Sequence, residues 1–189
     1  MNYEKILLVA VMVLTSAMTF AQQKEGSLTI QPKVGLNIAS LTDFDDSDPR
    51  FGVVAGAEFM YQATDMVGLS FGALYSMQGA KYDKTTTKLD YINIPVLANV
   101  YVAPGFAVKL GLQPGFNVNS KAKAKGNGGA VEADIDAKTV DLSIPIGLSY
   151  EFNNFVIDGR YNWGLTKVAK HSDCKNSVFQ ITLGYKLPL

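Results

Sequence analysis

The strongest constraint on this chain is a strict alternation of apolar and polar residues between positions 106 and 118. Every second residue from Phe106 to Val118 is apolar, and the residues between them are small or polar, with Lys109 and Gln113 among them. Side chains of a β-strand point alternately to its two faces, so this segment predicts a strand with one apolar face. The alternation leaves open whether that face meets a protein core or the acyl chains of a membrane.

Period-two patterns recur along the chain, and no segment beyond the N-terminus has a convincing helical period. Pro95 and Pro145 lie inside predicted strands, where a residue without an N–H group indicates a bulge. The segment 89–102 is apolar on both faces. We expect one all-β domain with no linker and with these eight strands: 28–38, 51–62, 67–78, 89–102, 106–119, 139–151, 155–165 and 178–187.

The N-terminus has the features of a secretory signal peptide. Lys5 precedes an apolar run from Ile6 to Met18, and small residues suited to a cleavage site follow, ending at Ala21. The run is shorter than the roughly 20 apolar residues of a membrane-spanning helix. We predict cleavage after Ala21, which makes residues 1–21 the signal peptide and residues 22–189 the exported domain. An uncleaved anchor helix is the alternative.

Composition narrows the possible environments of the domain. Charged residues make up 18% of the chain, compared with roughly 25% in soluble domains. The formal net charge is zero, which excludes the basic footprint of a nucleic-acid-binding protein. After Ala21 no apolar stretch has the length of a membrane helix, so any membrane passage must use strands.

The connections between the predicted strands alternate in length. Long connections at 39–50, 79–88, 120–138 and 166–177 alternate with short ones at 63–66, 103–105 and 152–154. Outer-membrane barrels combine long extracellular loops with tight periplasmic turns. In Greek-key sandwiches, long and short connections have no reason to alternate. The alternation favours an eight-stranded antiparallel up-and-down transmembrane β-barrel in the cell outer membrane. Its long loops would lie on the cell surface and both termini in the periplasm.

This interpretation assigns a direction to each strand face. Leu110 and Ile144 would face acyl chains, whereas Gln113 would face the lumen. A soluble lipocalin-like barrel would invert this arrangement and is the alternative fold. Charged side chains on the lumen face must be paired when buried, so we expect a structural network that plugs the barrel, formed by Lys33, Glu58, Lys109, Asp141, Glu151, Asp158 and Arg160.

Two further segments contain residue types that can carry chemistry. His171-Ser172-Asp173 contains the members of a hydrolytic triad, but sequence neighbours do not converge in the geometry that a triad needs. Cys174 cannot form an internal disulfide because it is the single cysteine. We interpret both as parts of a solvated loop, with a slightly activated exposed thiol as the alternative for Cys174.

Two other segments concentrate charge. The acidic run from Asp43 to Asp48 offers hard oxygen ligands for a divalent cation but lacks the glycine and final glutamate of the helix-loop-helix calcium motif. Lys121, Lys123 and Lys125 precede a glycine-rich stretch and predict a flexible basic loop. Solvated loops are the simpler interpretation of both. Contact with lipopolysaccharide phosphates or their bridging cations is the functional alternative.

Several motifs resemble the PorT-like outer-membrane β-barrel proteins of Bacteroidetes, over the whole mature chain. They are the signal ending at Ala21-Gln22, Pro32-Lys33-Val34-Gly35-Leu36-Asn37, Leu89-Asp90-Tyr91-Ile92-Asn93-Ile94-Pro95-Val96, Leu110-Gly111-Leu112-Gln113-Pro114-Gly115 and Leu183-Gly184-Tyr185-Lys186-Leu187. The resemblance implies an outer-membrane barrel. It also implies a link to the secretion of cell-surface proteins, which is the role of one branch of the family.

Three functions are compatible with these features. The first is a structural or accessory outer-membrane barrel, possible partners being outer-membrane lipids and lipopolysaccharide, the barrel-assembly machinery and other envelope or secretion proteins. The second is a narrow channel or a small-ligand-binding barrel. The third, an outer-membrane enzyme, is disfavoured because no catalytic constellation stands out. We expect no cofactor, no metal site and no nucleic-acid partner.

Overall fold

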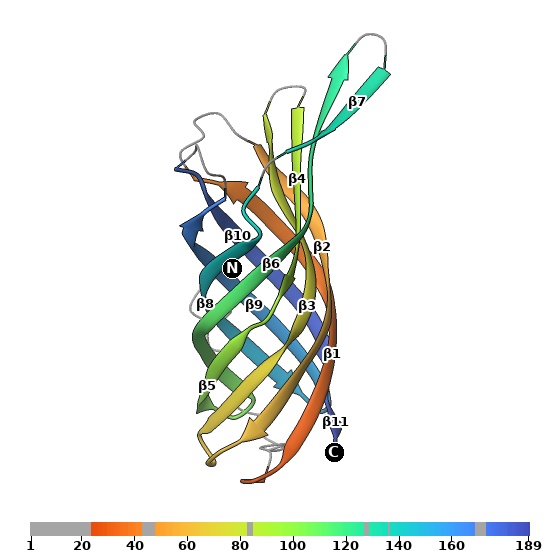
Figure 1. The fold of residues 1–189 in the computed structure, drawn as a ribbon. Coiled ribbons are helices and arrows are strands. Elements are labelled where there is room, and N and C mark those ends of the chain that lie inside the picture. The colour runs from red at the N-terminus through yellow and green to blue at the C-terminus, as the bar shows by residue number, and fades with distance from the viewer. Residues whose placement is uncertain (1–23, 43–47, 83–84, 127–128, 136, 169–172) are drawn as a thin grey trace, which may run out of the picture.

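The computed structural model describes residues 24–42, 48–82, 85–126, 129–135, 137–168 and 173–189. Within these ranges, no helix is long and apolar enough to cross a membrane. The predicted signal peptide, residues 1–21, lies outside the described residues. All the strands belong to a single sheet (Figure 1). They are β1 (Leu28–Leu41), β2 (Asp48–Gln62), β3 (Val67–Tyr82), β4 (Thr85–Asn93), β5 (Val96–Ala103), β6 (Phe106–Gly126), β7 (Gly129–Asp134), β8 (Val140–Phe152), β9 (Phe155–Lys167), β10 (Lys175–Tyr185) and β11 (Leu187–Pro188).

The sheet closes on itself because β1 pairs with both β2 and β10. β4 and β5 occupy one position in the wall, since each lies between β3 and β6. β7 extends β6 as a hairpin, and the two-residue β11 pairs with the start of β1. The wall therefore has eight antiparallel strands, which confirms the predicted barrel.

The two prolines do not produce the bulges that the sequence predicts. Asn93 and Val96 on the two sides of Pro95 keep the same register against β3 and against β6. The register of β8 is likewise unchanged at Pro145, which pairs with Asn162. The shifts in register fall elsewhere, one of them between Asp90 and Tyr91 where β4 meets β6. The missing N–H group of each proline is tolerated without displacement of the strand.

The apolar face of each strand lies on the outside of the barrel. Leu110 is 54% exposed, whereas Lys109 and Gln113, on the other face of the same strand, are 2% and 3% exposed. The same alternation holds on β10, where Ile181 is exposed and Gln180 is buried. An apolar exterior around a polar interior is the reverse of a soluble carrier, so the inverted alternative is wrong for this fold. The doubly apolar segment 89–102 also fits, because Leu89, Tyr91 and Leu97 are apolar residues that point inward and are buried.

The closing seam between β1 and β10 depends on a glycine. A Cβ atom placed on Gly35 would lie 1.9 Å from the carbonyl oxygen of Ile181 and 2.7 Å from the Cα atom of Thr182. Those two residues belong to β10, which pairs with β1 across the seam. Any larger residue at position 35 would push the two closing strands apart.

The strands reach further at one end of the barrel than the sequence indicates. We call this the long-loop end, because β1–β2, β3–β4, β6–β8 and β9–β10 connect there; the other is the short-turn end. Lys121 and Lys123 belong to β6 and pair with Asp134 and Glu132 of β7, so the predicted flexible basic loop is instead a hairpin. Figure 1 shows this hairpin, with the adjacent end of β4, projecting beyond the rest of the barrel wall.

Candidate functional site in the lumen

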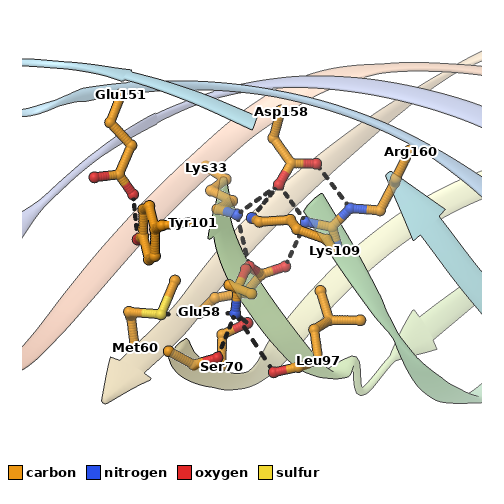
Figure 2. A network of polar contacts seen from close by, with 12 residues as sticks. Lys33, Glu58, Met60, Ser70, Leu97, Tyr101, Lys109, Glu151, Asp158 and Arg160 are labelled. Carbon is orange, nitrogen blue, oxygen red and sulfur yellow. Dashed lines mark hydrogen bonds and ion pairs between the residues drawn. The ribbon is translucent and has the colours of Figure 1, made fainter. Parts of the chain in front are cut away.

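Five charged side chains meet in the middle of the lumen (Figure 2). Lys33 Nζ lies 2.6 Å from Glu58 Oε2 and 3.5 Å from Asp158 Oδ2. Arg160 lies 2.9 Å from Asp158 Oδ1 through Nε and 2.9 Å from Glu58 Oε1 through Nη2. Lys109 forms an ion pair with Asp158. We call these five residues the central cluster.

The central cluster crosses the lumen from wall to wall. Lys33 comes from β1 and Lys109 from β6, two strands on opposite sides of the barrel, and Asp158 of β9 binds both. All five side chains are 4% exposed or less. The three cations exceed the two carboxylates by one charge, and the pairing that buried charges require is met for both acids. This arrangement ties distant strands together electrostatically.

The structure separates the other two predicted lumen charges from this cluster. Glu151 lies toward the short-turn end, where the Tyr101 hydroxyl donates to its Oε1 at 2.7 Å and Lys186 forms an ion pair with its other oxygen. Tyr101 and Lys186 were not among the predicted lumen residues. Tyr101 sits in the doubly apolar segment, and its inward direction follows from the period of two along β5.

Asp141 belongs to a third group, toward the long-loop end. Asn176 Nδ2 donates to Asp141 Oδ2 at 2.9 Å, and the Thr166 hydroxyl donates to the other carboxylate oxygen. Asn176 Nδ2 also lies 3.3 Å from the hydroxyl of Tyr91. The partners of Asp141 are thus hydrogen-bonding groups rather than the cations that the sequence suggests.

An apolar cluster adjoins this third group. Leu89, Tyr91 and Val168 are each 6% exposed or less, and partly buried side chains of Leu41, Ile135 and Ala137 pack against them. These residues come from the end of β1, from β4, from the connection that precedes β8 and from the connection that follows β9. Apolar packing across these connections covers part of the barrel at this end.

The remaining sequence candidates do not form a site in the described part of the chain. His171 and Ser172 lie outside the described residues, as does most of the acidic run 43–48. Asp173 forms an ion pair with Lys167. Cys174 is 5% exposed, so the prediction of a thiol in a solvated loop is wrong: the side chain is buried at the start of β10. Among the described residues, no group of three or more His, Cys, Asp and Glu side chains could hold a metal ion.

Charged residues also gather where the β6–β7 hairpin and the adjacent end of β4 project beyond the barrel wall at the long-loop end. We call this region the sheet extension. Lys88 Nζ donates to Glu132 Oε1 at 2.9 Å, and Lys123 Nζ lies 3.4 Å from the same oxygen. The hydrogen bond and charge of Lys88, supported by Lys123, hold the pKa of Glu132 below its ordinary value of 4.5. One carboxylate therefore serves two lysines from different strands.

A closed, eight-stranded wall with an apolar outside and an ion-paired inside defines a small transmembrane β-barrel of the outer-membrane type. The model of the outer membrane protein beta-barrel domain family matches residues 20–170. The chain belongs to this family and is an outer-membrane β-barrel protein.

Solved structures share the fold at low sequence identity. Neisserial surface protein A matches with a TM-score of 0.57 and 19% identity, covering 86% of this chain and 100% of the other. The attachment invasion locus protein Ail of Yersinia pestis matches with a TM-score of 0.52 and 17% identity, over 87% of this chain and 100% of the other. A second Ail structure, in complex with the heparin analogue sucrose octasulfate, matches with a TM-score of 0.53, 17% identity and the same coverages. No curated protein matches the chain significantly.

Proposed function

We propose that this protein is a closed, non-conducting outer-membrane barrel with a structural or accessory role. The central cluster carries the proposal, because Lys33 and Lys109 reach Asp158 from opposite walls. A solute passing through the lumen would have to separate buried ion pairs, which is costly in a low-dielectric interior. The lumen would then act as a brace, leaving the outward surface and the sheet extension to meet other molecules.

Planar-bilayer recording tests this proposal. We expect pure protein to insert without discrete conductance steps. The variant Lys109→Ala/Asp158→Ala removes one cation and one acid from the cluster at unchanged net charge, and we expect it to show openings that prove the assay's sensitivity. Steps of uniform size from the wild type, altered in that variant, would establish a channel instead.

The proposal includes an orientation, with the long-loop end at the cell surface and the short-turn end in the periplasm. Strand β1 begins and the chain ends at the short-turn end, as expected for export after removal of residues 1–21. Because Cys174 is buried, an engineered thiol is the better probe. An impermeant thiol reagent should label Asp173→Cys on intact cells in a Cys174→Ser background, and should label Asp65→Cys only after disruption of the outer membrane. The reverse pattern would invert the orientation.

The accessory role extends to the partners of the barrel. The resemblance of the segments around Gly35 and Asp90 to PorT-like proteins supports a link with surface-protein secretion, and delivery through the barrel-assembly machinery fits the barrel fold. The proposal has no enzymatic step, because both carboxylates of the central cluster are engaged by cations. Cross-linking in native outer membranes followed by co-purification tests for these partners; recovery of the barrel alone would leave a purely structural role.

One observation favours a second function, the binding of a small polar ligand or a narrow polar path. The buried amide groups of Asn162 and Gln180 have no hydrogen-bond partner on either polar atom within the described structure. Buried polar atoms in proteins are normally satisfied, so a polar guest in this part of the lumen would be stabilised. Native mass spectrometry of the purified barrel would detect such a ligand as an added mass lost in Asn162→Leu.

A further inference from the structure

The central cluster contains one more cation than carboxylate. Lys33, Lys109 and Arg160 face Glu58 and Asp158, and all five side chains are buried. Among the described residues, no other acid forms an ion pair with these three cations. A buried charge without a partner is costly in a low-dielectric interior. One further negative charge close to the cluster would therefore stabilise it.

The two remaining lumen acids do not supply this charge. Glu151 forms an ion pair with Lys186, so these two charges cancel. Asp141 lies on β8 six residues before Gly147, which is the register partner of Arg160. Six residues span about 20 Å along a strand. At that separation two unit charges attract each other about a fifth as strongly as at about 4 Å, so Asp141 is a weak counter-charge for the cluster.

Arg160 also has a hydrogen-bond donor that the cluster does not use. Its Nε and Nη2 atoms donate to the two oxygens of Asp158, each at 2.9 Å. The guanidinium group is a planar fork, so Nη1 lies on the side away from that carboxylate. Nη1 is buried and has no hydrogen-bond partner within the described structure. An unpaired buried donor on a charged group is costly, and an anion would be the strongest acceptor for it.

Two amide side chains without partners lie next to Arg160 on the inner face of the wall. Gln180 is its direct register partner on β10, and the Cβ atoms of such pairs are about 5 Å apart. Asn162 is the next inward residue along β9, about 7 Å away. In the part of the chain that the structure describes, neither polar atom of either amide has a hydrogen-bond partner. Each amide can therefore turn its NH2 group toward a guest that also contacts Arg160.

The wall beside these donors consists of small residues. Gly147 is the register partner of Arg160 on β8, and Pro145 is the partner of Asn162. A Cβ atom on Gly147 would lie 2.7 Å from the Cβ atom of Arg160, so a side chain at position 147 would displace the arginine. Because all three donors are buried, the guest that they can share is an ion of one or a few atoms.

We propose that the lumen holds one small monovalent anion, such as a halide, bound by Arg160 Nη1 and by the side-chain amides of Asn162 and Gln180. One negative charge balances the central cluster, whereas a divalent anion would reverse the imbalance. The inference rests on the second function proposed above, a small polar guest at the two amides. It gives that guest a charge, a size class and a third contact.

The dependence of stability on bromide concentration tests the proposal. Urea unfolding is followed by the heat-modifiable gel shift in zwitterionic vesicles, while sodium gluconate is replaced stepwise by sodium bromide at constant ionic strength. Gluconate is too bulky for the site. A ligand that binds one site of the folded protein raises the folding equilibrium constant in proportion to its concentration once the site is saturated. We therefore expect about a tenfold rise in that constant for each tenfold rise in bromide.

Gln180→Glu supplies the missing negative charge covalently. We expect this variant to lose the bromide dependence and to be more stable than the wild type in gluconate, although burying an acid is normally destabilising. Gln113→Glu is the matched control, because Gln113 is a buried lumen glutamine about 13 Å along β6 from Lys109. It should be less stable than the wild type and keep the full bromide dependence.

A bromide dependence of equal size in the wild type and in Gln180→Glu would overturn the proposal, because the salt would then act elsewhere. A wild type without bromide dependence would overturn it as well. A neutral added mass that is lost in Asn162→Leu would in that case leave the second function in place, and the lack of any such mass would remove both. Should Gln180→Glu fail to fold, Gln180→Leu must still bind bromide about tenfold more weakly, the usual effect of losing one hydrogen bond to a charged group.

Discussion

Lys33 and Lys109 approach from opposite walls of the barrel and bind the same oxygen of Asp158. A single carboxylate thus braces the barrel across its lumen, and Arg160 donates to both of its oxygens. No neutral side chain can replace this carboxylate, because its removal leaves the three cations of the central cluster with Glu58 as their one acid.

Asp158→Asn should therefore destabilise the barrel more than any single change on the lumen's polar face outside the cluster. Breaking a buried ion pair by removing one partner costs about 3–5 kcal/mol. The measurement is urea unfolding in lipid vesicles, followed by the heat-modifiable gel shift. Asp134→Asn, the same change on the exposed β7 strand, should have little effect. A second change, Lys109→Met, should recover part of the loss by restoring the charge balance.

The assignment of side chains to the lipid side or the lumen side of the wall can be tested with one outward and one inward residue of the same strand. Leu110→Arg places a charge on the apolar exterior, which costs about 2–4 kcal/mol at the bilayer midplane. Gln113→Ser shortens a lumen side chain whose Nε2 atom donates to Ser143 at 3.3 Å, so its effect should be about 1 kcal/mol or less. Ile144→Arg on β8 should behave like Leu110→Arg. Equal folding yields for Leu110→Arg and Gln113→Ser would contradict the assigned facing.

The closing seam makes a separate prediction. Gly35→Ala introduces a methyl group 1.9 Å from the Ile181 carbonyl oxygen, and the closing strands β1 and β10 must separate to accommodate it. We expect slower and less complete refolding into vesicles. Gly159→Ala is the control, because no atom lies within 4 Å of the added Cβ. The idea fails if both variants refold alike.

The ion pairs of Glu132 predict a titration outside the membrane. Since Lys88 and Lys123 lower its pKa below 4.5, the contribution of the carboxylate to the hairpin is complete above that ordinary value and is lost as the pH falls through the lowered folded value. A carbon NMR titration of the Glu132 carboxyl group should have its midpoint below 4.5. Lys88→Gln should raise the midpoint, whereas Lys81→Gln should leave it unchanged. A wild-type midpoint at or above the ordinary value would show that these contacts do not persist in solution.

The sequence predicts the membrane-crossing part of the barrel well, because an apolar exterior and a polar lumen both act on a period of two. Strand ends next to the short turns agree closely, as at Phe106 and Phe155. At the other end the strands leave the apolar layer, and the exterior no longer requires apolar residues. The sequence therefore predicts a flexible loop where the structure has the hairpin of β6 and β7, although the alternation of Lys121, Ala122 and Lys123 is itself a period of two.

The sequence predicts only in part which polar and charged side chains contact one another inside the lumen. The alternation assigns Glu151 and Asp158 to the same side of the wall, but it does not give their height, which depends on the stagger between strands. The structure accordingly places Glu151 with Lys186 and leaves Asp141 to Asn176 and Thr166. The burial of Cys174 follows the period of two in β10, whose residues Asn176 and Val178 are also buried, but the predicted strand begins only at 178 and leaves Cys174 in a loop.

Val118 is an extra residue in β6: Asn117 pairs with Tyr91 of β4 and Asn119 with Asp90, so Val118 has no partner on β4. The facing of every residue after it in β6 depends on this one insertion. Deleting Val118 would leave the sequence of the following segment unchanged, but it would exchange the residues on its inner and outer faces. Lys121 and Lys123 would then turn toward the inside of the sheet, and Ala122 would replace them outside. Variation in this barrel should thus tolerate substitutions along the hairpin far more readily than single-residue insertions or deletions at its base, whereas paired changes in length that restore the frame should survive.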